Sequence, residues 1–378
     1  MPKTRKLLSI GHSYVVSLNR RLVNEIARLG QGEWEVTTVA PAFIQGDLRP
    51  MHLETDAHEL CRLEAVPVYY SKFIHIMTYG WRLRDILQQN WDLVHCWEEP
   101  YILSGAQVAW WKTKKSPLIY STFQNKCKQY PPPFNWIEQY AMSKSTGWIA
   151  FGKTVAEALK SRPGYSSPMQ VITPGVDIQH FYPCVDAKYK IRRCLGWEEE
   201  GIPVIGYLGR FVPEKGLDLL MAVLDRLETP WRALFVGTGV MESSLRNWAK
   251  RYPKQVRICT DVKHHEVPQY LNAMDMLVAP SQTVSNWQEQ FGRMLIEAFA
   301  CAVPVIGSDS GEIPYVIQDA GLVVGENDQL GWVAAISDLL NSPSRRQELG
   351  KSGLERAHNF YTWTAVAKQH LQFFNELL

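Results

Sequence analysis

Two short stretches in the second half of the chain carry charged side chains at spacings that suit an anionic ligand. Arg210 and Lys215 stand in a loop between an apolar stretch and a helical pattern. Glu289 and Glu297 flank Gly292 at the expected start of another helix. Cations beside the exposed N–H groups of a helix start bind phosphates, and a glycine lets the backbone approach them closely. These residues predict a diphosphate site with carboxylates nearby for sugar or ribose hydroxyls.

Each stretch taken alone also fits a simpler interpretation. Arg210 and Lys215 fit an ordinary solvated loop, and Glu289 fits a favourable charge near a helix N-terminus. No metal site is expected, because the adjacent His264 and His265 point apart on regular structure and the seven cysteines never form a CxxC pair.

The segments that position these residues are expected to alternate between strands and helices. This alternation begins near the N-terminus and begins again near residue 204. Strands are expected at residues 6–10, 36–40, 92–95, 118–121 and 147–150, and again at 204–208, 233–236, 256–259, 276–279, 303–306 and 321–324. Such alternation predicts parallel sheets covered by helices. Ligands of these sheets bind at the carboxyl ends of the strands. The fold class is therefore α/β, with two doubly wound parallel-sheet domains and a ligand cleft between them.

Composition and charge narrow the class of protein further. Hydrophobic residues make up 46% and charged residues 21% of the chain, which excludes disordered and fibrous classes. The net charge of +2 gives no reason to expect nucleic acid as a partner. Scattered cysteines are typical of a reducing cytoplasm. Because no apolar run reaches the length of a membrane span, we expect a soluble cytoplasmic protein that can still sit on a membrane surface.

Taken together, these segments resemble the retaining glycosyltransferases of family 4, which have the GT-B fold of two Rossmann-like domains. The resemblance rests on Gly209–Gly216, Val236–Gly239, Asp275–Ser281, Glu289–Glu297, Val303–Pro314 and Gly321–Val324, and more loosely on Asp92–His95, Thr173–Asp177 and Phe360–Trp363. It implies an N-terminal acceptor domain of residues 1–185 joined by the final helix 361–378. A linker at 186–199 and a C-terminal nucleotide-sugar domain at 200–360 complete the expected division.

The resemblance also implies a role for each site residue. Arg210 and Lys215 would neutralise the diphosphate leaving group, and the departing phosphate would itself deprotonate the acceptor. Glu289 would hold the donor sugar and Glu297 the ribose, while His95 would lie beside the sugar. The nucleobase would lie near Val262. Further donor contacts would come from Gly11, Gly209, Phe291, Gly292, Arg293, Met294 and Leu295, with Arg293 either reaching the diphosphate or pairing with a nearby acid. No metal or other cofactor is implied.

The donor expected from the resemblance is UDP-glucose, with GDP-mannose as the second choice. Two other functions share the architecture: a nucleotide-sugar epimerase and an inactive nucleotide-sugar-binding scaffold. The Arg210–Lys215 and Glu289–Glu297 pairs favour transfer over epimerisation, because epimerisation needs acid and base groups around the sugar and no acceptor.

The acceptor is expected to be a glycan or a lipid-linked molecule. Two segments of the first domain, Tyr69–Arg84 and Trp110–Lys115, combine aromatic, apolar and basic residues. The first 185 residues hold 20 Lys and Arg against 15 Asp and Glu, so this half is mildly basic. Such segments predict peripheral contact with the anionic inner face of the cytoplasmic membrane. A helix with a buried aromatic face and a basic rim explains them equally well.

Overall fold

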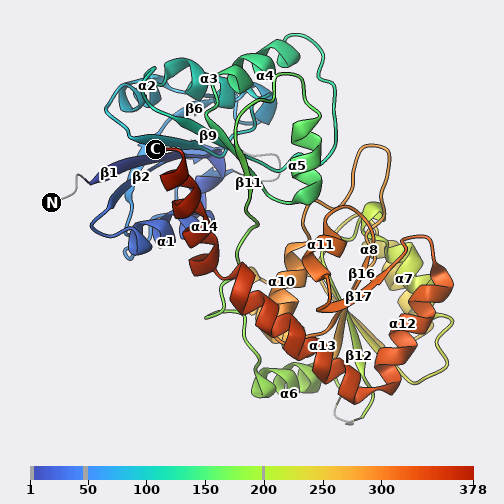
Figure 1. Cartoon of the computed structure of the whole chain (residues 1–378). Coiled ribbons are helices and arrows are strands. Elements are labelled where there is room, and N and C mark those ends of the chain that lie inside the picture. The colour runs from blue at the N-terminus through green and yellow to red at the C-terminus, as the bar shows by residue number, and fades with distance from the viewer. Residues whose placement is uncertain (1–3, 46–49, 198–200) are drawn as a thin grey trace. The chain divides into compact units, whose positions relative to one another are not determined.

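The computed structural model describes residues 4–45, 50–197 and 201–378 and divides into two compact units (Figure 1). The first unit runs to Pro174 and regains Trp363–Leu378, and the second is Gly175–Thr362. Each unit is built on one sheet whose strands all pair in parallel, as the repeated alternation of strands and helices predicts. Within the described residues, no helix is both long and apolar enough to cross a bilayer.

The first sheet has seven strands in the order β11-β10-β9-β8-β1-β2-β5. They are β1 (Arg5–Ile10), β2 (Trp34–Pro41), β5 (Arg62–Val66), β8 (Leu93–Cys96), β9 (Leu118–Thr122), β10 (Gly147–Ala150) and β11 (Met169–Val171). Its helices are α1 (Arg21–Leu29), α2 (Trp81–Leu87), α3 (Leu103–Trp111), α4 (Phe134–Ser143), α5 (Lys153–Lys160) and α14 (Trp363–Glu376). The central strands β8, β9 and β10 are buried along their whole length, as expected for strands covered on both faces.

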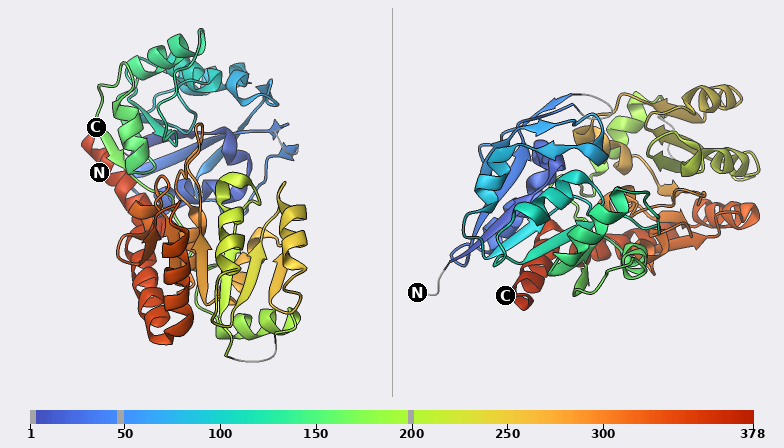
Figure 2. Two further views of the ribbon diagram at one scale, coloured as in Figure 1. Left: turned by 90° about the vertical axis from the view of Figure 1, so that its right-hand side faces the viewer. Right: turned by 90° about the horizontal axis from the view of Figure 1, so that it is seen from above.

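The second sheet has six strands in the order β14-β13-β12-β15-β16-β17. They are β12 (Val204–Leu208), β13 (Arg232–Val236), β14 (Val256–Cys259), β15 (Met276–Ala279), β16 (Val305–Ser308) and β17 (Gly321–Val324). Its helices are α6 (Val185–Cys194), α7 (Leu217–Leu224), α8 (Glu242–Ala249), α9 (Val267–Asn272), α10 (Arg293–Ala300), α11 (Ile313–Ile317), α12 (Gln329–Asn341) and α13 (Pro343–Arg356). One apolar cluster joins the sheet to α9, α10 and α11, and another joins it to α7, α8 and α12. Helices therefore cover both faces of this sheet (Figure 2).

Shorter elements complete the fold. Two antiparallel pairs, β3 (Phe43–Ile44) with β4 (Met51–His52) and β6 (Val68–Tyr69) with β7 (Thr78–Tyr79), belong to the first unit. Single turns of 3₁₀ helix stand at His12–Val15, Ser17–Arg20, Ile74–Ile76, Pro213–Lys215 and His264–Glu266, and a π-helical turn at Ala357–Tyr361.

The division between the units differs from the predicted one. The first unit ends at Pro174 rather than at residue 185, and the predicted linker 186–199 holds most of α6. Ile191 of α6 and the following Trp197 are buried in the core of the second unit. A stretch that buries apolar side chains gains stability from packing and does not behave as a linker. The end of the predicted linker, at residues 198 and 199, lies outside the described residues.

The final helix packs on the first unit, in agreement with the expected return of residues 361–378. Phe374 of α14 is fully buried, with its ring 6.1 Å from that of Trp34 at the start of β2. Thr364 donates a hydrogen bond to Glu25 of α1. The helix closes one face of the first sheet together with α1.

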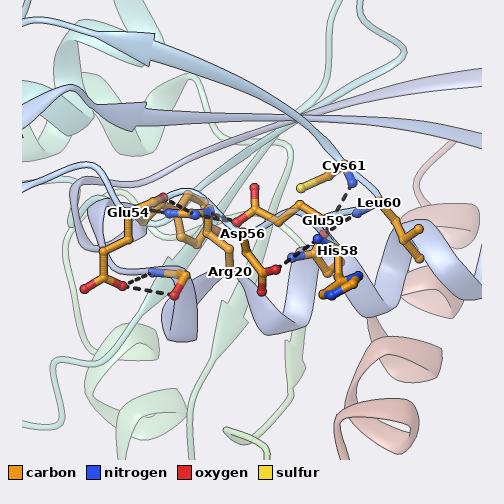
Figure 3. Close-up of polar contacts among 10 residues, drawn as sticks. Arg20, Glu54, Asp56, His58, Glu59, Leu60 and Cys61 are labelled. Atoms are coloured by element: carbon orange, nitrogen blue, oxygen red, sulfur yellow. Dashed lines mark hydrogen bonds and ion pairs between the residues drawn. The ribbon is translucent and has the colours of Figure 1, made fainter.

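A buried arginine, Arg20, holds together segments that lie between β1 and β5 in the sequence. Arg20 is fully enclosed, and its guanidinium donates to the Glu59 carboxylate and to the backbone carbonyls of Tyr14 and Glu54 (Figure 3). The amide oxygen of Asn24 on α1 accepts from the backbone N–H of Leu60. A buried charge is tolerated when it is paired and hydrogen-bonded in this way, so the irregular segment after β4 is held against α1.

Candidate functional site

The best-defined polar cluster of the second unit forms just beyond the carboxyl ends of its central strands β12 and β15. The Lys215 ammonium donates a hydrogen bond to Glu289 Oε2, and the Ser281 hydroxyl donates one to the same oxygen at 2.9 Å. Glu289 is only 6% exposed. The Lys215 ammonium also lies 4.9 Å from the centre of the Trp287 ring, a cation–π distance. Residues far apart in sequence therefore meet at the sheet edge where ligands of parallel sheets bind.

Backbone contacts hold the two loops of this cluster together. Gly216 has φ +73°, and a Cβ there would lie 1.8 Å from the carbonyl oxygen of Pro280, so only glycine fits between the loops. Gly311 has φ +56°, and a Cβ there would lie 2.1 Å from the Glu289 carbonyl oxygen. Both positions need a left-handed conformation and close approach, which other residues meet only with strain.

Arg210 lies in the same loop as Lys215 but points to solvent. Its side chain is 66% exposed, and its nearest carboxylate is that of Glu214 at 3.8 Å. Exposed pairs of this kind contribute little to stability, so the guanidinium can turn to an anionic ligand at small cost. Gly209, which precedes it, donates its N–H to the carbonyl of Val236 at the end of β13.

The predicted donor residues at the start of α10 differ in whether their side chains are exposed or buried. Gly292 caps the helix with φ +78° and ψ +62°, and α10 begins at the exposed Arg293. The side chains of Phe291 and Leu295 are buried in the core, and Met294 packs against it. Apolar side chains at this spacing pack inward. Phe291 and Leu295 can therefore line a donor only through their backbone, whereas the partly exposed Met294 can also use its side chain.

Glu297 lies on α10, eight residues after Glu289 in the sequence, and its side chain is partly buried. Desolvation by the surrounding protein raises its pKa to about 7, and the nearby charge of Arg293 opposes this shift. Near neutral pH the carboxyl group therefore exists in both protonation states. In either state it can hydrogen-bond a diol, as acceptor when ionised and as donor and acceptor when protonated.

Comparisons with known proteins identify the family of the chain. The model of the family described as glycosyl transferases group 1 matches residues 194–356, and that of glycosyltransferase family 4 matches residues 16–180. The two matches together take in both units. The chain belongs to glycosyltransferase family 4.

Relatives of the chain include enzymes whose names contain inositol compounds. The chain is 32% identical over 217 residues to a GDP-mannose-dependent monoacylated alpha-(1-6)-phosphatidylinositol monomannoside mannosyltransferase of Corynebacterium glutamicum, a match that covers 56% of this chain and 57% of the relative. It is 27% identical over 354 residues to a D-inositol 3-phosphate glycosyltransferase of Stackebrandtia nassauensis, covering 88% of this chain and 74% of the relative. The first match thus spans little more than half the length of that relative.

Solved structures share the fold. The sucrose-phosphate synthase of Thermosynechococcus elongatus superposes with a TM-score of 0.72 at 20% identity, covering 99% of each chain. With the two parallel-sheet units described above, this likeness establishes the GT-B fold of the family 4 chain.

Within this family 4 fold, the structure corrects the prediction for His95. Its imidazole is fully buried between β1 and β9, with Nδ1 3.3 Å from the Ser9 hydroxyl and Nε2 2.8 Å from the Ser121 hydroxyl. Burial, and secondarily the charge of His370, hold its pKa well below the usual value, so the ring stays neutral. A side chain enclosed in the core and bonded through both nitrogens has no exposed surface for a sugar in this structure, an arrangement typical of a structural histidine.

The remaining predicted residues are at loop positions. Val262 follows β14 and is partly exposed while packing against the core. Gly11 follows β1 and donates its N–H to the carbonyl of Val39 at 3.3 Å. Among the described residues, no group of three or more His, Cys, Asp and Glu is arranged to hold a metal ion.

Sequence reasoning missed several polar residues that the structure gathers at strand ends. Glu98 follows β8 and is fully buried, accepting from the backbone N–H of His12 at 2.6 Å and from the Tyr79 hydroxyl at 2.5 Å, with His12 Nδ1 at 2.6 Å. Although burial acts in the other direction, these partners lower the pKa of Glu98. Ser281 and Trp287 were missed in the second unit. The available signal for Glu98 and Ser281 was their place just after predicted strands, where parallel sheets carry ligand-binding residues. Trp287 lies eight residues beyond the end of β15, so this signal does not apply to it.

Proposed function

We propose that this chain transfers a hexose from a nucleoside-diphosphate donor to a glycan or lipid-linked acceptor, with the anomeric configuration retained. The observation that carries the proposal is the Lys215–Glu289–Ser281 cluster at the carboxyl end of the second sheet. It combines a cation for a leaving diphosphate with a carboxylate for sugar hydroxyls, and family 4 membership supplies the reaction class.

Charge neutralisation is the main contribution expected from the protein. As the bond between the anomeric carbon and the diphosphate oxygen breaks, negative charge builds on the diphosphate. Lys215 has three N–H donors, so it can bind a phosphate oxygen while it keeps Glu289. Arg210, exposed in the same loop, adds a second cation. Fixed charges placed where charge develops are among the largest contributions to catalysis.

The acceptor step follows from the same arrangement. The acceptor oxygen bonds to the anomeric carbon on the face that the diphosphate leaves, and its proton passes to a phosphate oxygen of that leaving group. Glu289 orients donor hydroxyls, and Glu297 binds the ribose of the nucleotide. Neither step requires a metal in this proposal, because Lys215 and Arg210 supply the positive charge.

The donor is the open part of the proposal, and two candidates stand. UDP-glucose is the donor expected from the sequence. GDP-mannose is supported by the name of the Corynebacterium glutamicum relative, and the names of both relatives favour an acceptor that contains inositol. We also propose that the enzyme works at the inner face of the cytoplasmic membrane, with its first unit in peripheral contact. Its seven cysteines are all free, as a reducing compartment favours.

Thermal unfolding with UDP, GDP and ADP and with their common sugar conjugates tests the donor site. A ligand present at about a hundredfold its dissociation constant stabilises by about 2.7 kcal/mol, a shift of a few degrees. We expect a shift with one nucleobase only, unchanged by a chelator. No shift with any nucleotide would contradict the proposal.

Incubation with the matching donor then separates the three functions. A transferase releases the nucleoside diphosphate and needs an acceptor for fast turnover. An epimerase instead converts the donor sugar to its epimer without an acceptor, and an inactive scaffold binds the donor and leaves it unchanged.

A further inference from the structure

A groove between α3 and α4 of the first unit is lined almost wholly by apolar side chains. Its volume is about 530 Å³, and its main lining residues are Leu103, Trp110, Trp111, Trp136, Ile137 and Tyr140. Trp110 is 73% exposed and Trp136 is 63% exposed. Large apolar surfaces left open in this way are typical of sites that bind a partner or a membrane.

The chemistry of the lining favours a hydrocarbon chain over a sugar as the occupant. Apart from the polar atoms of the tryptophans and Tyr140, Thr78 and Gln107 are the polar side chains among the described lining residues. The Gln107 amide is already used, because its oxygen accepts from the Tyr79 N–H at 2.7 Å and its nitrogen donates to the Tyr79 carbonyl at 2.8 Å. Sugar hydroxyls would lose hydrogen bonds to water with little in return. The groove therefore suits a hydrocarbon chain.

The apolar surface continues beyond the groove onto the segment between β6 and α2. Trp81 stacks on Trp111 with ring centres 5.5 Å apart, and the His75 ring lies 6.2 Å from that of Phe134 at the start of α4. Tyr70 and Phe73 in this segment are exposed. Tryptophan and tyrosine at such a surface are typical of the interfacial layer of a bilayer, because each has an apolar body and a polar group.

The charge around the groove is positive. Residues 103–144 hold six lysines, at 112, 114, 115, 126, 128 and 144, with no arginine or aspartate and one glutamate. Lys112 donates to the carbonyls of Thr113 and Ser116, whereas the lysines at 114, 115, 128 and 144 are exposed. That glutamate, Glu138, is buried and paired with Arg162. Lys144 lies over the Tyr140 ring at 5.6 Å, and Arg84 over the Trp81 ring at 5.5 Å. Basic groups beside exposed aromatic rings complement the negative surface of an anionic membrane.

We propose that the α3–α4 groove docks this chain on a bilayer of anionic phospholipid, with one lipid hydrocarbon chain filling the groove and the surrounding lysines facing the head groups. The inference rests on the proposed function in that a lipid-linked acceptor would be met at this surface. It assigns the docking to named side chains of the first unit, while the donor site belongs to the second.

Flotation of the purified full chain, with no donor or acceptor present, tests the proposal. The vesicles are phosphatidylcholine alone and phosphatidylcholine mixed with phosphatidylglycerol, at low ionic strength. We expect the protein to float with the mixed vesicles only, and less at high salt. Phosphatidylglycerol with brominated chains should quench the tryptophan fluorescence, because bromine reaches only rings in contact with the hydrocarbon.

Variants of exposed residues localise the contact without threatening the fold. Trp110→Ala with Trp136→Ala should weaken vesicle binding on the order of tenfold or more and reduce the quenching, and Lys114→Glu with Lys115→Glu should weaken binding to the mixed vesicles. The matched controls lie in the second unit: Leu330→Ala for the apolar change, and Lys250→Glu with Lys254→Glu for the charge change. These positions are exposed as well, and the controls should bind as the wild type does.

Three results would overturn the proposal: no flotation at low salt, binding unchanged in the tryptophan variants, or fluorescence changes with maltooligosaccharides that vesicles do not produce. The last result would identify a saccharide site. Since no sugar donor is present, a failure to bind vesicles leaves the transfer reaction standing. Loss of transfer in a chain that still floats would contradict the proposed function instead.

Discussion

Lys215 and Glu289 each stabilise the charge of the other. Both are largely buried, and each is the other's charge partner. Removing one takes the opposite charge from a largely buried group, which destabilises a protein more strongly than the pair stabilises it. Substitutions at either position therefore have to be judged by transfer rate and by folding together.

Lys215→Ala and Glu289→Ala should each lower kcat by about 100-fold, because each removes a group that acts on developing charge or on donor orientation. The kcat of Glu289→Gln should lie between those of the wild type and Glu289→Ala, since an amide still accepts a hydrogen bond from Ser281. Steady-state kinetics measure the loss, and circular dichroism checks the fold. The matched controls are the exposed Lys250→Ala and Glu228→Ala. Wild-type rates for both site variants would refute the site assignment.

Glu297 gives a pH dependence with a defined direction. Because its pKa is raised to about 7 in the folded chain, the folded state binds the proton more tightly than the unfolded state does. Its contribution to stability is therefore greatest below the unfolded pKa, falls as pH rises to about 7, and stays low above that. Glu297→Gln should remove this loss and stabilise the chain above about pH 7 by at most about 3 kcal/mol.

Denaturant titrations of wild type and Glu297→Gln at several pH values measure this difference. Near pH 4 the two proteins should be close in stability. A difference that does not grow between about pH 5 and 7 would show that the carboxyl group is not desolvated as described.

The loops that follow β12 and β15 set the positions of the site residues. The helices α7 and α10 each begin directly after a glycine in the left-handed region, Gly216 and Gly292. At Gly216 the close approach of Pro280 also leaves no room for a side chain. The loop that carries Lys215 and the loop that leads to Glu289 are therefore positioned by backbone contact.

Gly216→Ala should destabilise the second unit by more than about 3 kcal/mol, since it adds a backbone clash to a left-handed conformation that alone costs about 1–2 kcal/mol. Gly196→Ala is the matched control, because Gly196 has φ +72° and its nearest neighbour is a side-chain atom at 3.8 Å. Chemical denaturation compares the two. Equal losses would mean that the contact with Pro280 does not constrain the loops.

The last helix, α14, joins the first unit although it begins 322 residues after the end of β2 in the sequence. Phe374→Ala should destabilise that unit by about 3–5 kcal/mol, the usual cost of removing a buried aromatic ring. Leu378→Ala, at an exposed position, is the control and should change little. Hydrogen exchange should speed up in β1 and β2 and not in β12. An equal effect on both sheets would contradict the assignment of α14 to the first unit.

Much of this architecture could be predicted from local patterns. The expected strand at 6–10 is β1, that at 118–121 is β9, and that at 204–208 is β12, each within one residue at either end. Short buried strands of parallel sheets are continuous apolar runs, which a sequence displays directly. The edge strand β5 was not predicted, because its sequence Arg-Leu-Glu-Ala-Val mixes charged and apolar residues.

The sequence by itself determined what depends on neighbours along the chain: the two α/β domains, the loops that carry Arg210 and Lys215, and the glycine at the start of α10. Only the tertiary structure decided what depends on distant neighbours. It enclosed His95 between serines from two other strands, packed Ile191 of α6 into the core of the second unit, and brought Ser281 to Glu289. Burial and hydrogen bonding are properties of the packed chain, since side chains that meet in a parallel sheet come from strands separated by a crossover.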